Sequence, residues 1–350
     1  MNRPPAPNTP ALRRPTSYDV AKLAGVSQSA VSRCFRPGAS IAASTRERVE
    51  KAANKLGYQP NAIASGLITR RSNLIAVLIS NLTNLYYPEV LAELAHRLDD
   101  HGLRVLLFAL QHEGDVDAAL NEIWRYRVDG VISAARLSPD QLRACARRHV
   151  PVVLYNRSAE GEAVASVTCD SVGGERLLVD RLTAAGLKHF GIIAGPEDNY
   201  VGRERVAAAV GRLAELGHKA AVVPGRFDHG SGAAGLAELM QITNGQLEAV
   251  ICANDLMAIG AIDAARTEFG LSLPKDISIV GFDGVGPARW PSYRLTTIRQ
   301  PVGRMTDAAV RMLVERIEQV GLPPEVRTFA GTLIEGESAR LGSEAGRGLS

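Results

Sequence analysis

The sequence predicts an α/β protein with an all-α head at the N-terminal end and a core of parallel sheets in two lobes. Two patterns carry this prediction. Residues 16–60 show short helical patterns separated by glycines, with no strand pattern between them. From Leu74 onward, short apolar runs alternate with helical patterns, which is typical of parallel sheets covered by helices on both faces. A chain of 350 residues is long enough for two or three compact units.

The two ends of the chain show neither pattern. Residues 1–15 are rich in proline and polar residues, and residues 341–350 are also polar, so we expect two disordered tails. The first residues lack the apolar stretch of a signal peptide, and no apolar run reaches the roughly 18 residues that span a bilayer. Four cysteines lie far apart in no metal-type spacing, which indicates free thiols. We therefore expect a cytoplasmic protein with no membrane partner.

Charge is divided unevenly along the chain. Residues 1–71 hold 12 Lys and Arg side chains and 3 Asp and Glu side chains, a net charge of +9, whereas the remainder carries −6. A basic head on an acidic body indicates a polyanionic partner for the head alone. On charge alone, a solvated basic segment that binds nothing is the alternative.

Two helices around a glycine turn open the head. Thr16 and Asp19 have the spacing of a capping box, which predicts the start of a helix. Three apolar residues then fall on one face of that helix: Val20, Leu23 and Ala24. Gly25 predicts its end, because glycine adopts a positive φ without strain, and Ser27 can cap the next helix.

The second helix, residues 28–36, has two separate faces. Its polar side chains share one side: Gln28, Ser29, Ser32, Arg33 and Arg36. Its apolar side chains share the other: Ala30, Val31, Cys34 and Phe35. Amide, hydroxyl and guanidinium groups can read base edges, since arginine pairs with guanine and glutamine with adenine. The pattern predicts a helix that enters a DNA groove, and an ordinary packing helix is the alternative.

A third helix braces the first two. Ser44 and Glu47 have capping-box spacing at its start, and Gly57 marks its end. Its apolar stripe consists of Val49, Ala52, Ala53 and Leu56. The three helices together predict a helix-turn-helix head over residues 16–60.

The runs 19-DVAKLAGVSQSAVSR-33 and 45-TRERVEKAANKLGYQPNAIASGL-67 resemble the head of the lactose/galactose-repressor (LacI/GalR) family of bacterial transcription regulators. The resemblance implies a homodimer that binds a palindromic double-stranded operator. It places the head's DNA contacts at Tyr18, Ser27, Gln28, Ser29, Ser32 and Arg33. The turn at residues 36–42 and Ser17, which stands at a usually apolar position, depart from the family's pattern.

Residues 61–72 resemble the family's hinge. A helix of about eight residues that contains Gly66 is marginal alone in water, so we expect it to order only when supported. The resemblance implies that this segment pairs with its dimer mate over the minor groove through Asn61, Ala64 and Leu67. Leu67 is the residue expected to wedge between base pairs. A plain interdomain linker is the alternative.

Eight strand-like apolar runs follow the hinge: residues 74–79, 105–110, 130–133, 150–155, 190–195, 220–225, 249–254 and 277–282. Helical patterns lie between them at residues 88–101, 115–126, 173–186, 203–217, 231–241 and 255–269. Because eight units exceed one simple doubly wound sheet, we expect a core over 73–340 with two lobes. Their expected limits are 73–168 with 298–328, and 169–297 with 329–340. The resemblance implies the periplasmic-binding-protein-like fold.

Polar residues just beyond the apolar runs are candidate ligand contacts, because ligands bind at the carboxyl ends of parallel strands. These residues are Asn156, Arg157, Asp170, Asn254, Asp255 and Asp283. By position in the family's motifs, the effector contacts are Asn156, Arg205, Phe227, Asn254 and Asp283, and Tyr86 and Tyr87 follow the first strand. This set suits a sugar or sugar derivative, whose hydroxyls bind polar groups and whose apolar face packs on an aromatic ring. Asn156 stands where the family often has an acidic residue, and each residue has an alternative role as a helix cap.

Catalytic and metal-binding motifs are missing from the sequence, so we expect no enzyme activity, no catalytic residue, no cofactor and no bound metal. Three classes of protein remain: a ligand-responsive DNA-binding regulator, a solute-binding protein of transport, and a two-lobed sugar enzyme. The basic helical head favours the regulator. The family's usual behaviour favours a repressor that its effector releases, and the lack of a heptad-rich tail after Leu322 favours a dimer over a tetramer.

Overall fold

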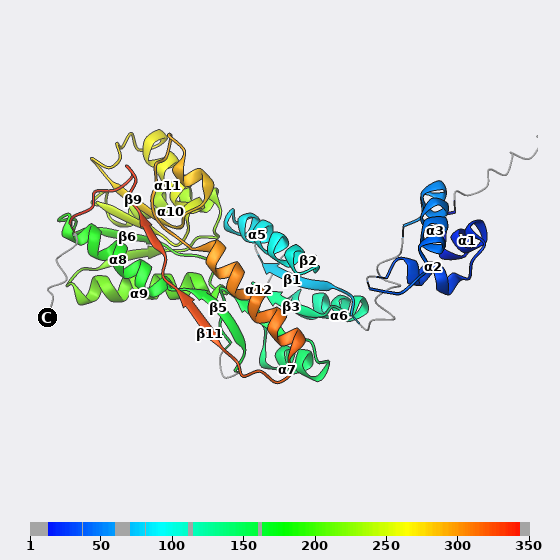
Figure 1. The fold of residues 1–350 in the computed structure, drawn as a ribbon. Coiled ribbons are helices and arrows are strands. Elements are labelled where there is room, and N and C mark those ends of the chain that lie inside the picture. Colours follow the sequence, from blue (N-terminus) through cyan, green and yellow to red (C-terminus); the bar gives the residue numbers. More distant parts are fainter. Residues whose placement is uncertain are drawn as a thin grey trace, which may run out of the picture. The chain divides into compact units, whose positions relative to one another are not determined.

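The computed structural model describes residues 13–36, 38–59, 71–80, 82–110, 115–159 and 163–343. It divides into two compact units, a head (Met1–Ser72) and a body (Asn73–Ser350) (Figure 1). The predicted hinge contacts Asn61, Ala64 and Leu67, and most of both predicted tails, lie outside the described residues.

The described part of the head forms three helices: α1 (Ser17–Ala24), α2 (Gln28–Cys34) and α3 (Ala43–Leu56). The predicted capping box at the start of α1 is confirmed. The Asp19 carboxylate accepts hydrogen bonds from the Thr16 backbone N–H at 2.8 Å and from the Thr16 hydroxyl at 2.7 Å. Gly25 and Gly57 end α1 and α3 with φ values of 62° and 64°, in the left-handed region that favours glycine.

Two details of the predicted head are wrong. Leu23 is 46% exposed, because the buried stripe of α1 is Val20, Ala21 and Ala24 instead. The predicted capping box at Ser44 does not form, because α3 already begins at Ala43 and Ser44 therefore lies inside the helix. Its intended partner Glu47 accepts a hydrogen bond from Lys51 one turn later, at 2.8 Å.

The described part of the body contains two six-stranded sheets. The strands of the first sheet (lobe 1) are β1 (Leu74–Ser80), β2 (Arg104–Leu110), β3 (Gly130–Ser133), β4 (Val152–Tyr155), β5 (Ala165–Cys169) and β11 (Val326–Phe329). Their order across the sheet is β11-β5-β4-β3-β1-β2, and the pairs are parallel. The helices of lobe 1 are α5 (Tyr86–Asp100), α6 (Val116–Tyr126), α7 (Pro139–Arg147) and α12 (Val302–Glu318).

The second sheet (lobe 2) has the order β12-β10-β9-β8-β6-β7. Its strands are β6 (Phe190–Ile193), β7 (Ala220–Val223), β8 (Ala249–Cys252), β9 (Ser278–Asp283), β10 (Thr296–Arg299) and β12 (Thr332–Ile334). Its helices are α8 (Ser171–Ala184), α9 (Tyr200–Glu215), α10 (His229–Ile242), α11 (Asp255–Thr267) and the 3₁₀ turn η2 (Gly286–Arg289). Only β12, which runs antiparallel to β10, breaks the parallel pattern among the described strands.

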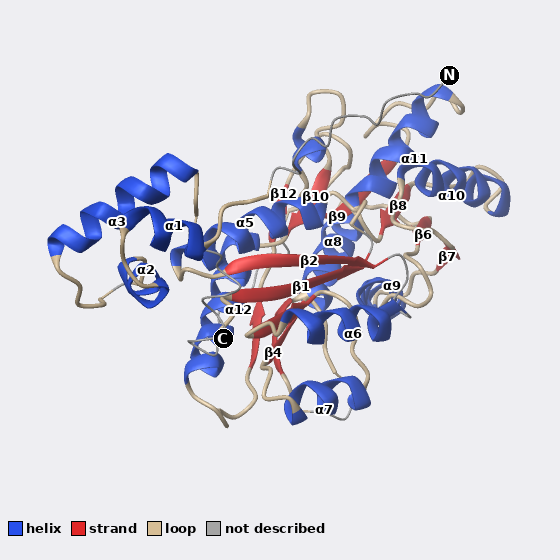
Figure 2. Ribbon diagram, turned by 90° about the vertical axis from the view of Figure 1, so that its right-hand side faces the viewer, coloured by secondary structure: helices blue, strands red, loops and turns tan. Residues whose placement is uncertain are grey.

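Helices cover both faces of the sheets, as the continuous apolar strands predict (Figure 2). In β1, Ile75, Val77 and Ile79 belong to the cluster that includes α5 and α12. Ala76 and Leu78 belong to the cluster on the other side, with α6 and α7. The predicted α/β fold with two parallel-sheet lobes is confirmed. Within the described ranges, every helix is too short or too polar to cross a bilayer.

The described chain passes between the lobes three times: between Cys169 and Ser171, between Arg299 and Val302, and between Phe329 and Thr332. The last two passages place α12 and β11 in lobe 1 although they lie near the end of the chain. Strands β5, β10, β11 and β12 lie outside the predicted apolar runs, because each is short and contains at least one polar residue.

Helices α10 and α11 of lobe 2 cross at two glycines. A Cβ atom added at Gly232 would lie 2.0 Å from the Met257 carbonyl oxygen, and one added at Gly260 would lie 2.0 Å from the His229 carbonyl oxygen. The neighbouring atoms are backbone, so they cannot move aside as a flexible side chain could. The close approach of these helices therefore depends on both glycines.

We expect Gly232→Ala to lower the free energy of unfolding by ~1–3 kcal/mol, because the added methyl group forces the two helices apart. Gly211→Ala is the matched control, since Gly211 is exposed in α9 with nothing within 4 Å of an added Cβ. Alanine should stabilise that helix by up to about 1 kcal/mol. Urea denaturation measures both variants, and equal effects at the two positions would contradict the close crossing.

Candidate functional site

Helix α2 presents the predicted polar face. Gln28, Ser29, Arg33 and Arg36 are exposed and Ser32 is half-buried, whereas Val31 and Cys34 are buried against the rest of the head. The structure thus separates the two sides of the helix as the sequence predicts. Tyr18 on α1 is also exposed, at 73%, an unusually large value for an aromatic side chain within a helix.

Local hydrogen bonds hold this face in place. Ser27 caps α2, its hydroxyl accepting from the Ala30 N–H at 3.2 Å. The Gln28 amide donates to the Ser17 hydroxyl at 3.3 Å, so the polar residue at position 17 connects α1 to the exposed face. On the buried side, the Arg46 guanidinium of α3 donates to the Cys34 carbonyl at 2.8 Å. The exposed donors and acceptors therefore belong to a rigid three-helix unit.

A second candidate site lies between the lobes of the body. A cavity of about 20 Å³, enough for one water molecule, is lined by residues from both lobes. The lining residues are Asn84, Tyr86, Tyr87, Asn156, Arg157, Asn199, Val201, Arg205, Phe227, Asp283 and Gln300. Six of the seven predicted effector residues belong to this set: Tyr86, Tyr87, Asn156, Arg205, Phe227 and Asp283. Carboxyl ends of strands meet here, as expected for parallel sheets.

Arg205 is the buried centre of this cavity, with 3% of its surface exposed. Its guanidinium donates to an Asp283 carboxylate oxygen at 3.0 Å and to the Ala253 carbonyl at 2.7 Å. The same group lies over the Phe282 ring, 3.8 Å from its centroid. Burial raises the pKa of the Asp283 carboxyl, and the Arg205 cation counteracts that effect.

A chain of side-chain hydrogen bonds extends from this pair into lobe 1. Gln300, beside the second passage between the lobes, donates to the Asp283 carboxylate at 2.7 Å. Asn156 donates to the Gln300 side-chain oxygen at 2.8 Å, and it accepts from the Cys169 N–H at 3.1 Å. We call Asn156, Gln300, Asp283 and Arg205 the interlobe relay. It connects the end of β4 to lobe 2 beside two of the three passages.

Three residues that line the cavity have unusual backbone conformations. Asn156, Phe227 and Asp283 have φ values of 53°, 61° and 126°, in the region that non-glycine residues rarely occupy. Strain of this kind costs of order 1–3 kcal/mol per residue and concentrates at functional sites. Three such residues line one small cavity, which marks it as a site where packing determines the backbone.

Two glycines make room for Phe227. A Cβ atom at Gly195 would lie 2.4 Å from the Phe227 ring, and one at Gly202 would lie 3.1 Å from it. Asn199 caps α9 by accepting from the Gly202 N–H at 3.0 Å, so the same loop also fixes the start of the helix that carries Arg205. The sequence prediction missed these glycines, because nothing local distinguishes them from ordinary turn residues.

Asn254, the seventh predicted effector residue, does not line the cavity. It is completely buried, and its side-chain oxygen caps α11 by accepting from the Met257 N–H at 2.9 Å. Its amide donates to the Phe227 carbonyl at 3.2 Å. Both ends of the side chain therefore have protein partners, and Asn254 supports the cavity only through Phe227.

The sequence prediction also missed Gln300 and Asn84 among the lining residues. Gln300 follows β10, a strand outside the predicted apolar runs, so no strand end pointed to it. Asn84 precedes α5, where its side-chain oxygen accepts from the Tyr86 N–H at 3.2 Å. Arg157 is a candidate because it follows the end of a predicted strand, and it does line the interlobe cavity.

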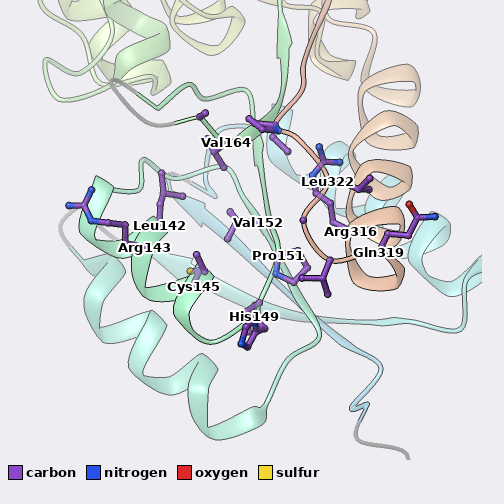
Figure 3. A pocket seen from close by; sticks show the side chains of 17 residues that line it. Leu142, Arg143, Cys145, His149, Pro151, Val152, Val164, Arg316, Gln319 and Leu322 are labelled. Carbon is purple, nitrogen blue, oxygen red and sulfur yellow. The ribbon is translucent and has the colours of Figure 1, made fainter.

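A larger cavity of about 350 Å³ lies in lobe 1, between α7 and the end of α12 (Figure 3). Its walls are mainly apolar, with Leu142, Val152, Val164 and Leu322 among them. None of the predicted site residues lines it. The smaller interlobe cavity, by contrast, is lined by amide, carboxylate, guanidinium and phenol groups that can bind hydroxyl groups.

The described ranges contain no group of three His, Cys, Asp or Glu side chains that could hold a metal ion. Cys34, Cys145, Cys169 and Cys252 are free and buried. Burial raises the pKa of the Cys145 thiol to about 11, which keeps it protonated and unreactive near neutral pH.

Comparison with known proteins decides the family. The family model for bacterial regulatory proteins of the lacI family matches residues 16–61, and the model for the periplasmic binding protein-like domain matches residues 179–339. The HTH-type transcriptional repressor PurR of Klebsiella pneumoniae subsp. pneumoniae is 31% identical over 311 residues, covering 86% of this chain and 90% of PurR. This chain belongs to the lacI family of bacterial regulatory proteins.

Solved structures of transcription regulators show the same fold. The lac repressor dimer bound to operator and the anti-inducer ONPF is 28% identical, with a TM-score of 0.82 over 93% of this chain and 99% of that one. The complex of the transcriptional regulator CelR with cellobiose is 29% identical, with a TM-score of 0.70 over 93% of this chain and 100% of that one. The predicted regulator is thus confirmed as a helix-turn-helix transcription regulator rather than a transport protein or an enzyme.

We expect Gln300→Ala to lower the free energy of unfolding by ~1–3 kcal/mol, because Asn156 and Asp283 each lose a buried hydrogen-bond partner. Gln319→Ala, at an exposed position after α12, is the control and should change stability by less than about 0.5 kcal/mol. Urea denaturation of the two variants checks this. A Gln300 variant as stable as the control would show that the relay contributes nothing to the fold.

Proposed function

We propose that this protein is a repressor that binds a palindromic operator as a homodimer in the cytoplasm and that a sugar-like effector releases it. The observation that carries the proposal is the exposed polar face of α2, on a head that matches the lacI family model. The lac repressor dimer bound to operator supports the mode of DNA binding, and the CelR–cellobiose complex supports a carbohydrate effector.

The division of labour follows the predicted domains. Residues 16–60 bind DNA, residues 61–72 form the hinge, and residues 73–340 bind the effector and the second subunit. In a dimer, two copies of α2 face successive major grooves, so the operator has the two-fold symmetry of the protein. Gln28, Ser29 and Arg33 then face base edges, while Tyr18, Ser27 and Ser32 lie beside the phosphates. Asn61, Ala64 and Leu67 contact the minor groove.

The interlobe cavity is where the effector binds. Arg205 and Asp283 offer a donor and an acceptor side by side, since Arg205 Nε and one Asp283 oxygen have no hydrogen-bond partner in the described structure. Neighbouring hydroxyl groups on a sugar ring would satisfy both atoms, and the Phe227 ring would cover an apolar ring face. No metal or cofactor is needed for this recognition.

The size of the cavity implies that the lobes rearrange when the effector binds. A space of about 20 Å³ holds one water molecule and excludes a sugar, so the lobes must move apart before the effector enters. The effector then acts through its different affinity for the two lobe arrangements. By exchanging hydrogen bonds with the interlobe relay, the bound effector changes the angle between the lobes, and this changes the spacing of the two hinges in the dimer.

Arg33→Ala should weaken binding to the preferred operator by ~1–3 kcal/mol, because it removes a bidentate contact to a base. The operator is first selected from random duplexes with the purified protein, and fluorescence anisotropy then measures both variants. Arg48→Ala, at an exposed position of α3, removes the same charge from another face and is the control. Equal losses on operator and random DNA would assign Arg33 to phosphate contact only.

Arg205→Lys should abolish the effector response and leave operator affinity within about twofold. Lysine keeps the charge but lacks the planar fork that reaches both Asp283 and the Ala253 carbonyl. A thermal-shift screen of neutral sugars and sugar acids on the unaltered protein identifies the probe, and operator release by that probe measures the response. Normal release from the lysine variant would remove Arg205 from the effector site.

A further inference from the structure

Glu175 is a buried carboxyl group that none of the roles described above uses. It lies in the first half of α8 with 1% of its surface exposed. Both of its carboxyl oxygens are buried, and neither has a hydrogen-bond partner anywhere in the described ranges. Burying an ionised carboxylate without a partner costs several kcal/mol, so a group in this position retains its proton.

Glu175 follows a residue that packs on the same aromatic ring as Arg205. The preceding residue, Gly174, packs on the Phe282 ring so closely that a Cβ atom there would lie 2.8 Å from it. The Arg205 guanidinium covers the same ring, at 3.8 Å from its centroid. While both terminal nitrogens of Arg205 are engaged, its Nε atom is buried without a partner. Gly174 and the Arg205 guanidinium thus both pack on the Phe282 ring, and the Arg205 Nε donor and the two Glu175 oxygens are all buried without a hydrogen-bond partner among the described residues.

Charged and titratable groups reach this region from three neighbouring elements. They are Arg205 on α9, Asp283 on β9 and Cys252 on β8. Burial raises the pKa of Glu175 to about 8, an effect that Arg205 opposes and Asp283 reinforces. The Cys252 thiol also has its pKa raised by burial, so it stays neutral and cannot serve as a proton acceptor. Arg205 is thus the only one of these groups that favours ionisation of Glu175.

We propose that Glu175 is the reserve counter-ion of Arg205: neutral while Asp283 holds the guanidinium, and ionised when the charge of Asp283 is removed or drawn away. The two carboxyl groups compete for one cation, as carboxylates that share a site do. Ionisation breaks the O–H bond of Glu175, leaves the electron pair on the carboxylate, and passes the proton to buffer. The guanidinium remains a cation throughout.

One consequence of this role, a pH-dependent effector affinity, rests on the proposed function. An effector that engages Asp283 releases a proton from Glu175, so its affinity rises as the pH increases toward about 8 and levels off above that value. The competition between the carboxyl groups is itself a property of the free protein. It can therefore be tested without DNA or effector, and its failure is distinguishable from failure of the proposed function.

The test is a carbon-13 NMR titration of the full chain labelled at the glutamate side-chain carboxyl carbon. Glu175→Gln removes one resonance and so assigns it. In the unaltered protein this resonance should titrate near pH 8, and in Asp283→Asn its midpoint should fall by at least one pH unit, about a tenfold change in acidity. A midpoint in the ordinary glutamate range, or one that Asp283→Asn leaves unmoved, overturns the proposal.

Two further measurements cover a failure of Asp283→Asn to fold. In Arg205→Gln the midpoint should rise, because the only favourable charge is lost, and an unchanged midpoint refutes the pairing.

Thermal unfolding provides the second readout. The folded state keeps a proton that the unfolded chain loses above its ordinary glutamate pKa, so stability should fall as the pH rises from about 4.5 to about 8. Glu175→Gln should lack this component, and identical pH profiles refute a neutral Glu175.

Discussion

A permanently charged guanidinium group, buried where lobe 2 faces lobe 1, is the constraint on which the rest of the body depends. Arginine keeps its proton at any ordinary pH, so Arg205 must find an anion and carbonyl acceptors where it lies. Asp283 and the Ala253 carbonyl provide them. The left-handed backbone at Asp283 is tolerated because the pair it completes would otherwise leave a buried charge uncompensated.

The same pair connects the two lobes. Gln300 donates from its amide nitrogen to Asp283 and accepts with its oxygen from Asn156. One amide beside a passage between the lobes therefore binds a residue of each lobe. Any molecule that inserts among these groups must exchange partners in lobe 1 and lobe 2 together. Ligand binding in the cavity can therefore change the angle between the lobes directly, because the hydrogen bonds of the interlobe relay lie beside the segments where the chain passes between the lobes.

The parts that the sequence predicts well are those decided by local chemistry. The faces of α2 follow from helical spacing, Gly25 and Thr16 mark the limits of α1, and continuous apolar runs mark the inner strands. Prediction fails where distant residues decide the outcome. Ser44 has the right spacing for a cap but lies inside α3, and Asn254 has the right position for a ligand contact but caps α11. Gln300 and Gly195 are recognisable only once their partners, Asp283 and Phe227, are in place.

The late position of α12 in the chain has a consequence for biosynthesis. Its apolar side chains, Met305, Ala309 and Leu313 among them, cover the inner strands of lobe 1. Those strands leave the ribosome first, whereas their cover is translated more than 130 residues after β5. Synthesis of lobe 1 thus starts before that of lobe 2 but is completed after it. Until α12 is translated, an apolar face of lobe 1 is uncovered and prone to aggregation. A chain truncated before Val302 would lack α12 and would expose this apolar face of lobe 1.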